Sequence, residues 1–300
     1  ALAGLIKRGR TKDWILRCTL SVRDGLAGTP NPVVNPAVRP LKFDTASILF
    51  PVLASSSSHE TTVDAVTSVL RLDTREQKLT PEFSDKYPCG ARYGRWTLKD
   101  VETRAIELEV GLPLTTWETV FDEALALKAA WPPGNSYPAL PASALAEQKY
   151  CDPKHASVAA MVRDWTEGKP AQAIPPVVLA KFFASKVMQG FRVNGSGRRG
   201  DLSGQFIGLE LREVQETIAT GQGNEHEIAC VLAAAYRAAG LPARIVIGYD
   251  LSKTKGSSAP FPRGGSSGGN VRSWVEFCLM DMTTKAPTPG WVPVDAVRQK

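Results

Sequence analysis

The stretch 224–249, NEHEIACVLAAAYRAAGLPARIVIGY, constrains the fold more than any other part of the chain. Asn224 followed three residues later by Glu227 is a capping box, which satisfies the free N–H groups at a helix start. The residues that follow are rich in alanine and leucine, so they form a helix at little cost. Gly240 supplies the left-handed residue that ends a helix, and a proline two residues later prevents its continuation. The β-branched run 243–249 then predicts a buried strand.

Other elements are predicted on both sides of this helix and strand. Apolar residues at helical spacing predict three upstream helices, at 156–167, 177–189 and 210–219. Two further strands are predicted downstream, at 271–279 and 291–295. The Gly/Ser-rich segment 252–270 has too few apolar groups to pack and is expected to be a mobile loop. Helices followed by antiparallel strands make this half of the chain α+β.

The first 130 residues are predicted to be mostly strand. Period-two or short apolar patterns occur at 13–22, 46–52, 63–72 and 103–110. These patterns favour an N-terminal β-sandwich-like domain at 1–130. The prolines of WPPGNSYPALPAS, at 131–143, exclude a helix or a central strand and mark a linker. We therefore expect a Pro-rich linker at 131–155 and an α+β domain at 156–300.

Composition narrows the class of protein. The five cysteines are odd in number and contain no CxxC pair, which favours reduced thiols and a cytoplasmic setting. With three histidines in distant segments, neither a metal site nor a cofactor is expected. No apolar run is long enough to span a bilayer. The first residues do not resemble a signal peptide, yet they lack an initiator Met, so a secreted origin stays open.

Charge gives a weaker signal about partners. The net charge is +6, and the tight basic clusters are RGR at 8–10 and GRRG at 197–200. This charge permits attraction to nucleic acid or another anionic surface. No nucleic-acid-binding motif accompanies it, so ordinary solvated surface charge is the preferred interpretation.

Three motifs together resemble one family of enzymes. The phrase GNEHEIACVLAAAYRAAGLPARIVIGY resembles the transglutaminase-like signature, in which G-x-C-x-[DE] opens a helix and a phrase like LLRAAGIPARVVxGY follows. Downstream, VRSWVEFCL resembles HAWVEVYL, and GWVPVDAV resembles GWVPVDPT. The resemblance covers roughly 176–296. It implies a papain-like core of helices packed on an antiparallel sheet.

In that family the three motifs hold a cysteine, a histidine and an aspartate. A cysteine at a helix N-terminus is activated as a thiolate, the histidine transfers its proton and the aspartate orients the histidine. In this sequence the matching positions are Glu225, Arg272 and Asp295. Arginine does not deprotonate in proteins and no thiol stands at 225, so the family's acyl transfer is blocked. The charges still alternate in sign, so we expect a salt-bridge relay in which Arg272 lies between the two carboxylates.

No neighbouring residue is expected to rescue the chemistry. Cys230 should face about 140° away from Glu225 on the helix, in the core. Cys278 should lie roughly 20 Å along the strand from Arg272. His226 adjoins Glu225 but is expected to point elsewhere.

The leading functional hypothesis is therefore a pseudoenzyme that binds a protein or peptide or helps to assemble a larger structure. Its binding cleft would be lined by Trp274, His226 and Asn224 and flanked by the 252–270 loop. One alternative is an active peptidase or amidase with a replaced nucleophile. Another is a basic structural protein that contacts nucleic acid or an anionic surface.

Overall fold

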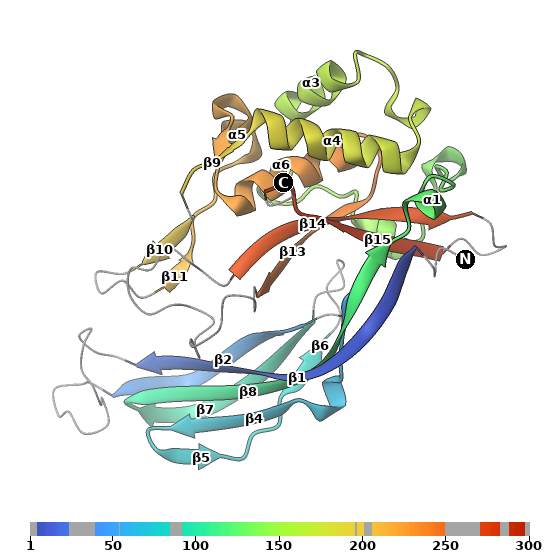
Figure 1. The fold of residues 1–300 in the computed structure, drawn as a ribbon. Coiled ribbons are helices and arrows are strands. Elements are labelled where there is room, and N and C mark those ends of the chain that lie inside the picture. The colour runs from blue at the N-terminus through green and yellow to red at the C-terminus, as the bar shows by residue number, and fades with distance from the viewer. Residues whose placement is uncertain are drawn as a thin grey trace. The chain divides into compact units, whose positions relative to one another are not determined.

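The computed structural model of this chain describes residues 5–23, 40–53, 55–84, 92–195, 197–200, 206–249, 271–282 and 288–297. The chain divides into two compact units (Figure 1). The first, Arg8–Glu118, is called the β unit here. The second combines Ala1–Lys7 with Thr119–Lys300 and is called the α+β unit. The predicted loop at 252–270 lies outside the described residues.

Two antiparallel sheets make up the β unit. One sheet has the order β1-β8-β4-β5, with β3 also paired to β8. Its strands are β1 (Ile6–Arg23), β8 (Ala105–Phe121), β4 (Thr67–Leu72), β5 (Arg75–Gln77) and β3 (His59–Thr61). The other sheet has the order β2-β7-β6, with strands β2 (Leu41–Val52), β7 (Arg92–Thr103) and β6 (Glu82–Ser84).

Side chains from both sheets of the β unit share one core. Trp96 of β7 is fully buried, and its indole N–H donates to the Ser68 hydroxyl of β4 at 3.2 Å. Leu70 and Leu108 from the first sheet and Ile48 and Leu98 from the second belong to the same buried cluster. Facing sheets with a shared apolar interior confirm the predicted sandwich-like, strand-rich N-terminal region.

Two local predictions were wrong. The strand expected from residue 63 begins only at Thr67, because Val63–Ala65 forms a 3-10 turn. The Pro-rich passage contains a 3-10 turn, Pro133–Asn135, and a short helix, α2 (Ala139–Ser143). Pro141 is tolerated there because it lies in the first helical turn, where backbone N–H groups have no partner within the helix.

The α+β unit carries helices and strands at the predicted places, although the third upstream helix, predicted from residue 210, begins only at Val214. Its described helices are α1 (Glu123–Ala126), α2, α3 (Ala156–Trp165), α4 (Pro176–Gly190), α5 (Val214–Thr220) and α6 (Glu225–Ala238). Its main sheet has the antiparallel order β13-β14-β15, with β13 (Ala243–Tyr249), β14 (Val271–Asp281) and β15 (Thr288–Val294). Two small pairs accompany it: β9 (Arg192–Val193) with β12 (Gln222–Gly223), and β10 (Arg198–Gly200) with β11 (Phe206–Leu209). This mixed architecture confirms the predicted α+β class.

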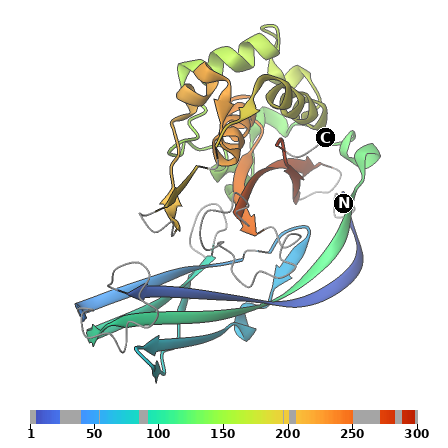
Figure 2. The same cartoon turned by 60° about the vertical axis from the view of Figure 1, so that its left-hand side comes forward.

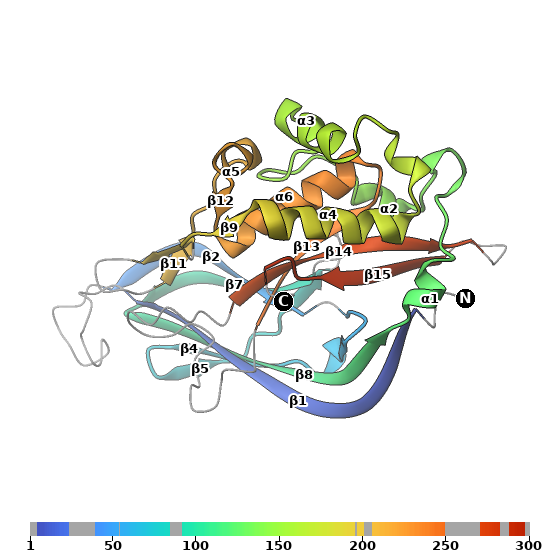
Figure 3. The ribbon, with the colours of Figure 1, turned by 45° about the horizontal axis from the view of Figure 1, so that its top comes forward.

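Helix α6 is the centre of the α+β unit. It lies between the sheet and α4 (Figure 3), and the view in Figure 2 shows the helices gathered on one face of β13–β15. Its residues are buried from His226 to Arg237, since alanines on every face allow close packing. Tyr236 is fully buried, stacks on Phe183 at 6.2 Å and donates its hydroxyl to the Ala180 carbonyl at 2.8 Å.

The sharp turn after α6 is fixed by two residues of the RAAGLPAR phrase. Gly240 has a φ of +82°, a left-handed conformation that glycine adopts without strain. The buried Arg237 guanidinium donates to the carbonyls of Ala243 and Ala146, each at 2.9 Å, and to the Gln148 side chain at 2.9 Å. Arg237 therefore joins the helix end, β13 and the segment after α2.

Candidate functional site

The N-terminus of α6 is built as the capping box predicts. The Asn224 side chain accepts from the backbone N–H groups of His226 and Glu227, each at 3.0 Å. The Glu227 carboxylate in turn accepts from the Asn224 N–H at 3.0 Å. Glu225 is thereby held in the first turn of the helix, with 24% of its side chain exposed. A carboxylate at this position is favoured by the helix dipole.

The structure brings Arg272 and Asp295 to the same place. Arg272 lies at the start of β14, and Asp295 directly follows β15. The Arg272 Nη2 lies 2.5 Å from the Asp295 Oδ2, and its Nε lies 3.9 Å from the Glu225 Oε2. Arg272 therefore lies between the two carboxylates, in the geometry that we expected. The three residues are called the charged cluster here.

The charged cluster is partly shielded from water. Its side chains are 19% exposed at Arg272, 24% at Glu225 and 27% at Asp295. The second Asp295 oxygen accepts from the Val297 N–H at 3.1 Å, which fixes the carboxylate against the backbone. At this burial the ion pairs are screened less than pairs on an open surface.

His226 and Ser273 form a second, fully interior contact next to the cluster. The His226 Nδ1 is hydrogen-bonded to the Ser273 hydroxyl, and the residues are 6% and 3% exposed. Burial lowers the pKa of His226, against the opposing effect of Glu225 and Glu227. The His226 ring therefore lies in the interface between α6 and β14, where it meets Ser273.

Asn224, His226 and Trp274, which were expected to line a binding cleft, differ in how deeply they are buried. Asn224 and His226 are buried and hydrogen-bonded, so they support the site from inside. Trp274 is half-buried and lies two residues along β14 from Arg272, on the same side of the strand. Its ring packs on Gly248 of β13, where a Cβ would lie 2.4 Å from the indole. A side chain at 248 would therefore displace the tryptophan.

Sequence reasoning missed Arg212, which completes the support of α6. Its backbone N–H and its guanidinium both donate to the Glu227 carboxylate, at 2.8 Å and at 2.8–3.1 Å. Burial raises the pKa of Glu227, but the hydrogen bonds from Arg212 and Asn224 outweigh it, so the pKa is lowered. Arg212 lies within the helix predicted at 210–219, but the structure begins α5 only at Val214 and leaves Arg212 before it. The helical pattern gave no signal that its guanidinium reaches Glu227.

The described thiols near α6 and β14 are buried. Burial raises the pKa of Cys230 and of Cys278 to about 12, and that of Cys151 to about 11. These groups are protonated at neutral pH and therefore lack thiolate reactivity. Cys230 is a core residue of α6, as predicted.

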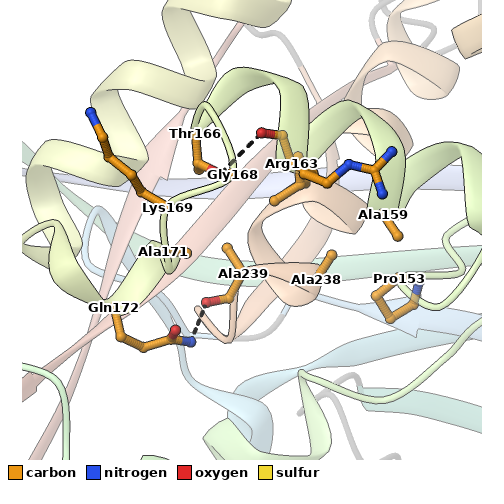
Figure 4. Close-up of a pocket in the computed structure, with 11 residues that line it drawn as sticks. Pro153, Ala159, Arg163, Thr166, Gly168, Lys169, Ala171, Gln172, Ala238 and Ala239 are labelled. Atoms are coloured by element: carbon orange, nitrogen blue, oxygen red, sulfur yellow. Dashed lines mark hydrogen bonds between the residues drawn. The ribbon is translucent and has the colours of Figure 1, made fainter.

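A surface hollow of about 270 Å³ lies at the other end of α6, about 20 Å from Glu225 by helix rise (Figure 4). Its lining includes Arg163, Thr166, Lys169, Gln172 and Ala239. Gln172 donates to the Ala239 carbonyl at 2.9 Å, and the Thr166 hydroxyl donates to the Arg163 carbonyl at 3.3 Å. This hollow is separate from the charged cluster.

Two further features are absent from the part of the chain that the structure describes. Within those ranges no three His, Cys, Asp or Glu side chains gather in a way that could hold a metal ion. None of the helices in the described part of the chain has the length and apolar character that a membrane crossing requires.

Comparison with known proteins gives a family match over the part of the chain that holds the charged cluster. Residues 194–296 match the family model described as the transglutaminase-like superfamily. No curated protein matches the chain. A candidate cysteine protease from Cytophaga hutchinsonii has a similar fold, with 13% identity, a TM-score of 0.60, and 98% of this chain and 79% of that chain covered. The periplasmic domain of TgpA from Pseudomonas aeruginosa matches with 15% identity, a TM-score of 0.36, and 93% and 88% covered.

Proposed function

Because residues 194–296 match the transglutaminase-like superfamily, we propose that this domain has lost that family's chemistry and serves to bind a protein or peptide. One observation carries the proposal: Arg272 lies between Glu225 and Asp295. Glu225 stands where the family has a cysteine, and Arg272 stands where it has a histidine. The charged cluster therefore replaces a proton-transferring site with a fixed set of ion pairs.

The chemistry of the charged cluster supports inactivity at each step of acyl transfer. A carboxylate is a poor nucleophile toward an amide, and a guanidinium cannot take up or release a proton at neutral pH. The nearest described thiol on α6, Cys230, is buried and protonated. The ion pairs that remain can stabilise the fold but cannot turn over a substrate.

Retention of the scaffold supports a binding role. Trp274 is half-buried and lies two residues from Arg272 on β14. Tryptophan and arginine are enriched among the interface residues that contribute most to binding energy. The surface around Trp274 is therefore the proposed contact. The cytoplasmic location expected from the cysteines stays a prediction.

Two measurements test the proposal. The purified protein should not incorporate a fluorescent amine into casein or hydrolyse amide substrates. Peptides selected from a random library on the wild-type protein should include a group that binds Trp274→Ala at least tenfold more weakly. Val178→Ala, at an exposed apolar site of α4, is the matched control and should bind them unchanged. Turnover by the wild-type protein would refute the inactivity, and a library that yields no peptide sensitive to the Trp274 substitution would refute the contact surface.

A specific contact favours one alternative, an active hydrolase with a replaced nucleophile. The hydrogen bond between Ser273 and His226 is the kind that activates a serine. Both residues are more than nine-tenths buried, so a substrate carbonyl cannot approach the hydroxyl as the fold stands. A fluorophosphonate probe decides the question: labelling of Ser273 would establish the hydrolase, and its absence supports the binding module.

A further inference from the structure

The β unit has an exposed sheet edge at β1. Strand β1 pairs with β8, and no other strand among the described residues pairs with it. Every residue from Arg8 to Ile15 is exposed. A strand at an edge presents a row of backbone N–H and C=O groups that can pair with another chain. This row is about 25 Å long at ordinary strand rise.

The exposed edge is strongly basic. Residues 8–17 contain a single acidic residue, Asp13, and four cationic ones: Arg8, Arg10, Lys12 and Arg17. Two of the cations lie over tryptophan rings: Arg8 over Trp117, and Lys12 over Trp14, each at 3.9 Å from the ring centroid. These contacts hold the charges close to the sheet surface.

A hollow of about 440 Å³ adjoins the edge. It is lined by Asp13, Trp14, Ile15, Thr62, Pro113, Leu114 and Thr115. Trp14 is 40% exposed and Ile15 is 62% exposed. The segment therefore combines the backbone of an edge strand, positive charge and a recess lined partly by Trp14 and Ile15.

Protection against aggregation explains only part of this arrangement. Lysine and arginine commonly blunt edge strands. That role does not require two large apolar side chains, Trp14 and Ile15, exposed beside a recess. Pairing of β1 with β1 of a second copy is disfavoured, because it would set four cations against four cations.

We infer that β1 binds an acidic, extended peptide segment of another protein, which adds to the sheet as a further strand. The backbone of the peptide pairs with β1 along Arg8–Ile15, its carboxylates face the cations, and one apolar side chain enters the recess. A single-stranded nucleic acid matches the charge but lacks the alternating backbone N–H and C=O groups that a ladder with an edge strand requires. This surface lies in the β unit and does not depend on the function proposed for the α+β unit.

The test uses the full chain and a fluorescein-labelled peptide of alternating glutamate and valine, nine residues long. Fluorescence anisotropy should show saturable binding. The same peptide with alternate backbone nitrogens methylated should bind at least tenfold more weakly, because it cannot form the ladder of hydrogen bonds. A lysine–valine counterpart should also bind at least tenfold more weakly.

Variants of the chain localise the binding. Arg10→Glu combined with Lys12→Glu should weaken binding at least tenfold, with an unchanged circular dichroism spectrum. The matched control, Lys42→Glu combined with Lys99→Glu, changes the net charge equally on the other sheet and should alter binding less than twofold. Ile15→Asp should also weaken binding, through the recess.

Several outcomes would overturn the inference. If the glutamate–valine peptide shows no saturable binding, β1 does not bind acidic extended peptides. Equal binding of the methylated peptide would leave only non-specific charge attraction. Displacement of the peptide by an equimolar oligo-dT strand would assign the edge to nucleic acid, and a dimer in sedimentation that depends on Ile15 would assign it to a second copy.

Discussion

The side chains of His226 and Ser273 are hydrogen-bonded to each other in the interior. In the sequence His226 directly follows Glu225, and Ser273 directly follows Arg272. The hydrogen bond between these two side chains fixes the first turn of α6 against the start of β14. The residues that precede them are thereby brought to the same end of the interface, where the charged cluster forms. The interior contact and the ion pairs are therefore parts of one arrangement.

Ser273→Ala should destabilise the protein by about 1–3 kcal/mol, because it leaves a buried imidazole nitrogen without its partner. Urea unfolding followed by circular dichroism measures the loss. Ser185→Ala, which removes a hydroxyl from the solvent-facing side of α4, is the control and should change stability by less than about 0.5 kcal/mol. Equal stability of the two variants would show that the interior hydrogen bond contributes nothing.

Stability should depend on pH through His226. Its pKa is lowered from 6.5 in the folded protein, so the unfolded chain binds more protons as the pH falls below about 6.5. The free energy of unfolding should therefore decrease from pH 7.5 to pH 5.5. His226→Gln should flatten this decrease. The range lies above the titration of Glu227, whose lowered pKa makes stability fall only at more acidic pH. An unchanged slope in His226→Gln would assign the dependence to other groups.

Arg272→Ala should destabilise the fold by about 1–3 kcal/mol, because it leaves two neighbouring carboxylates without their cation. The estimate lies below that of a fully buried pair because the three side chains are 19–27% exposed. Arg272→Lys should recover part of the loss, since it restores the charge without the planar fork. Arg163→Ala, at an exposed position of α3, should have little effect. A loss at Arg272 no larger than at Arg163 would show that the ion pairs are not stabilising.

Glu227→Ala should be more damaging than Glu225→Ala. Glu227 is buried and accepts hydrogen bonds from Arg212 and Asn224, so its removal should cost about 3–5 kcal/mol. Glu225 is more exposed, so Glu225→Ala should lower the free energy of unfolding by roughly 1 kcal/mol or less. Thermal unfolding of the two variants gives the ranking, and the reverse order would contradict the support role assigned to Glu227.

Restoring the family residues tests the replaced chemistry. Glu225→Cys combined with Arg272→His should give a thiol that iodoacetamide labels within minutes at pH 6, because a histidine and a helix N-terminus lower a thiol pKa. None of the four cysteines that the structure describes should behave in this way in the wild-type protein, since burial raises the pKa of Cys18, Cys151, Cys230 and Cys278. Rapid alkylation of one wild-type cysteine at pH 6 would overturn the inactive assignment.

Much of the α+β unit follows from local sequence. The capping box of Asn224 and Glu227, the alanine-rich run and Gly240 set where α6 begins and ends, and the structure has it at Glu225–Ala238. The resemblance of three motifs to one family also predicts that Glu225, Arg272 and Asp295 lie near one another, as the two ion pairs show. The prediction that the Pro-rich segment 131–143 contains no helix was wrong, since α2 lies at Ala139–Ser143. A proline in the first turn of a helix is compatible with a short helix.

The sequence by itself determined the backbone of α6 and β13 and the identities of the charged cluster, because capping, propensity and spacing act between residues close in the chain. Only the tertiary structure decided that Ser273 meets His226, that Arg212 holds Glu227, and that Trp274 packs on Gly248. Each of these pairs joins segments at least fifteen residues apart. Such contacts depend on how whole elements pack against one another, and a local pattern of residues does not specify that packing.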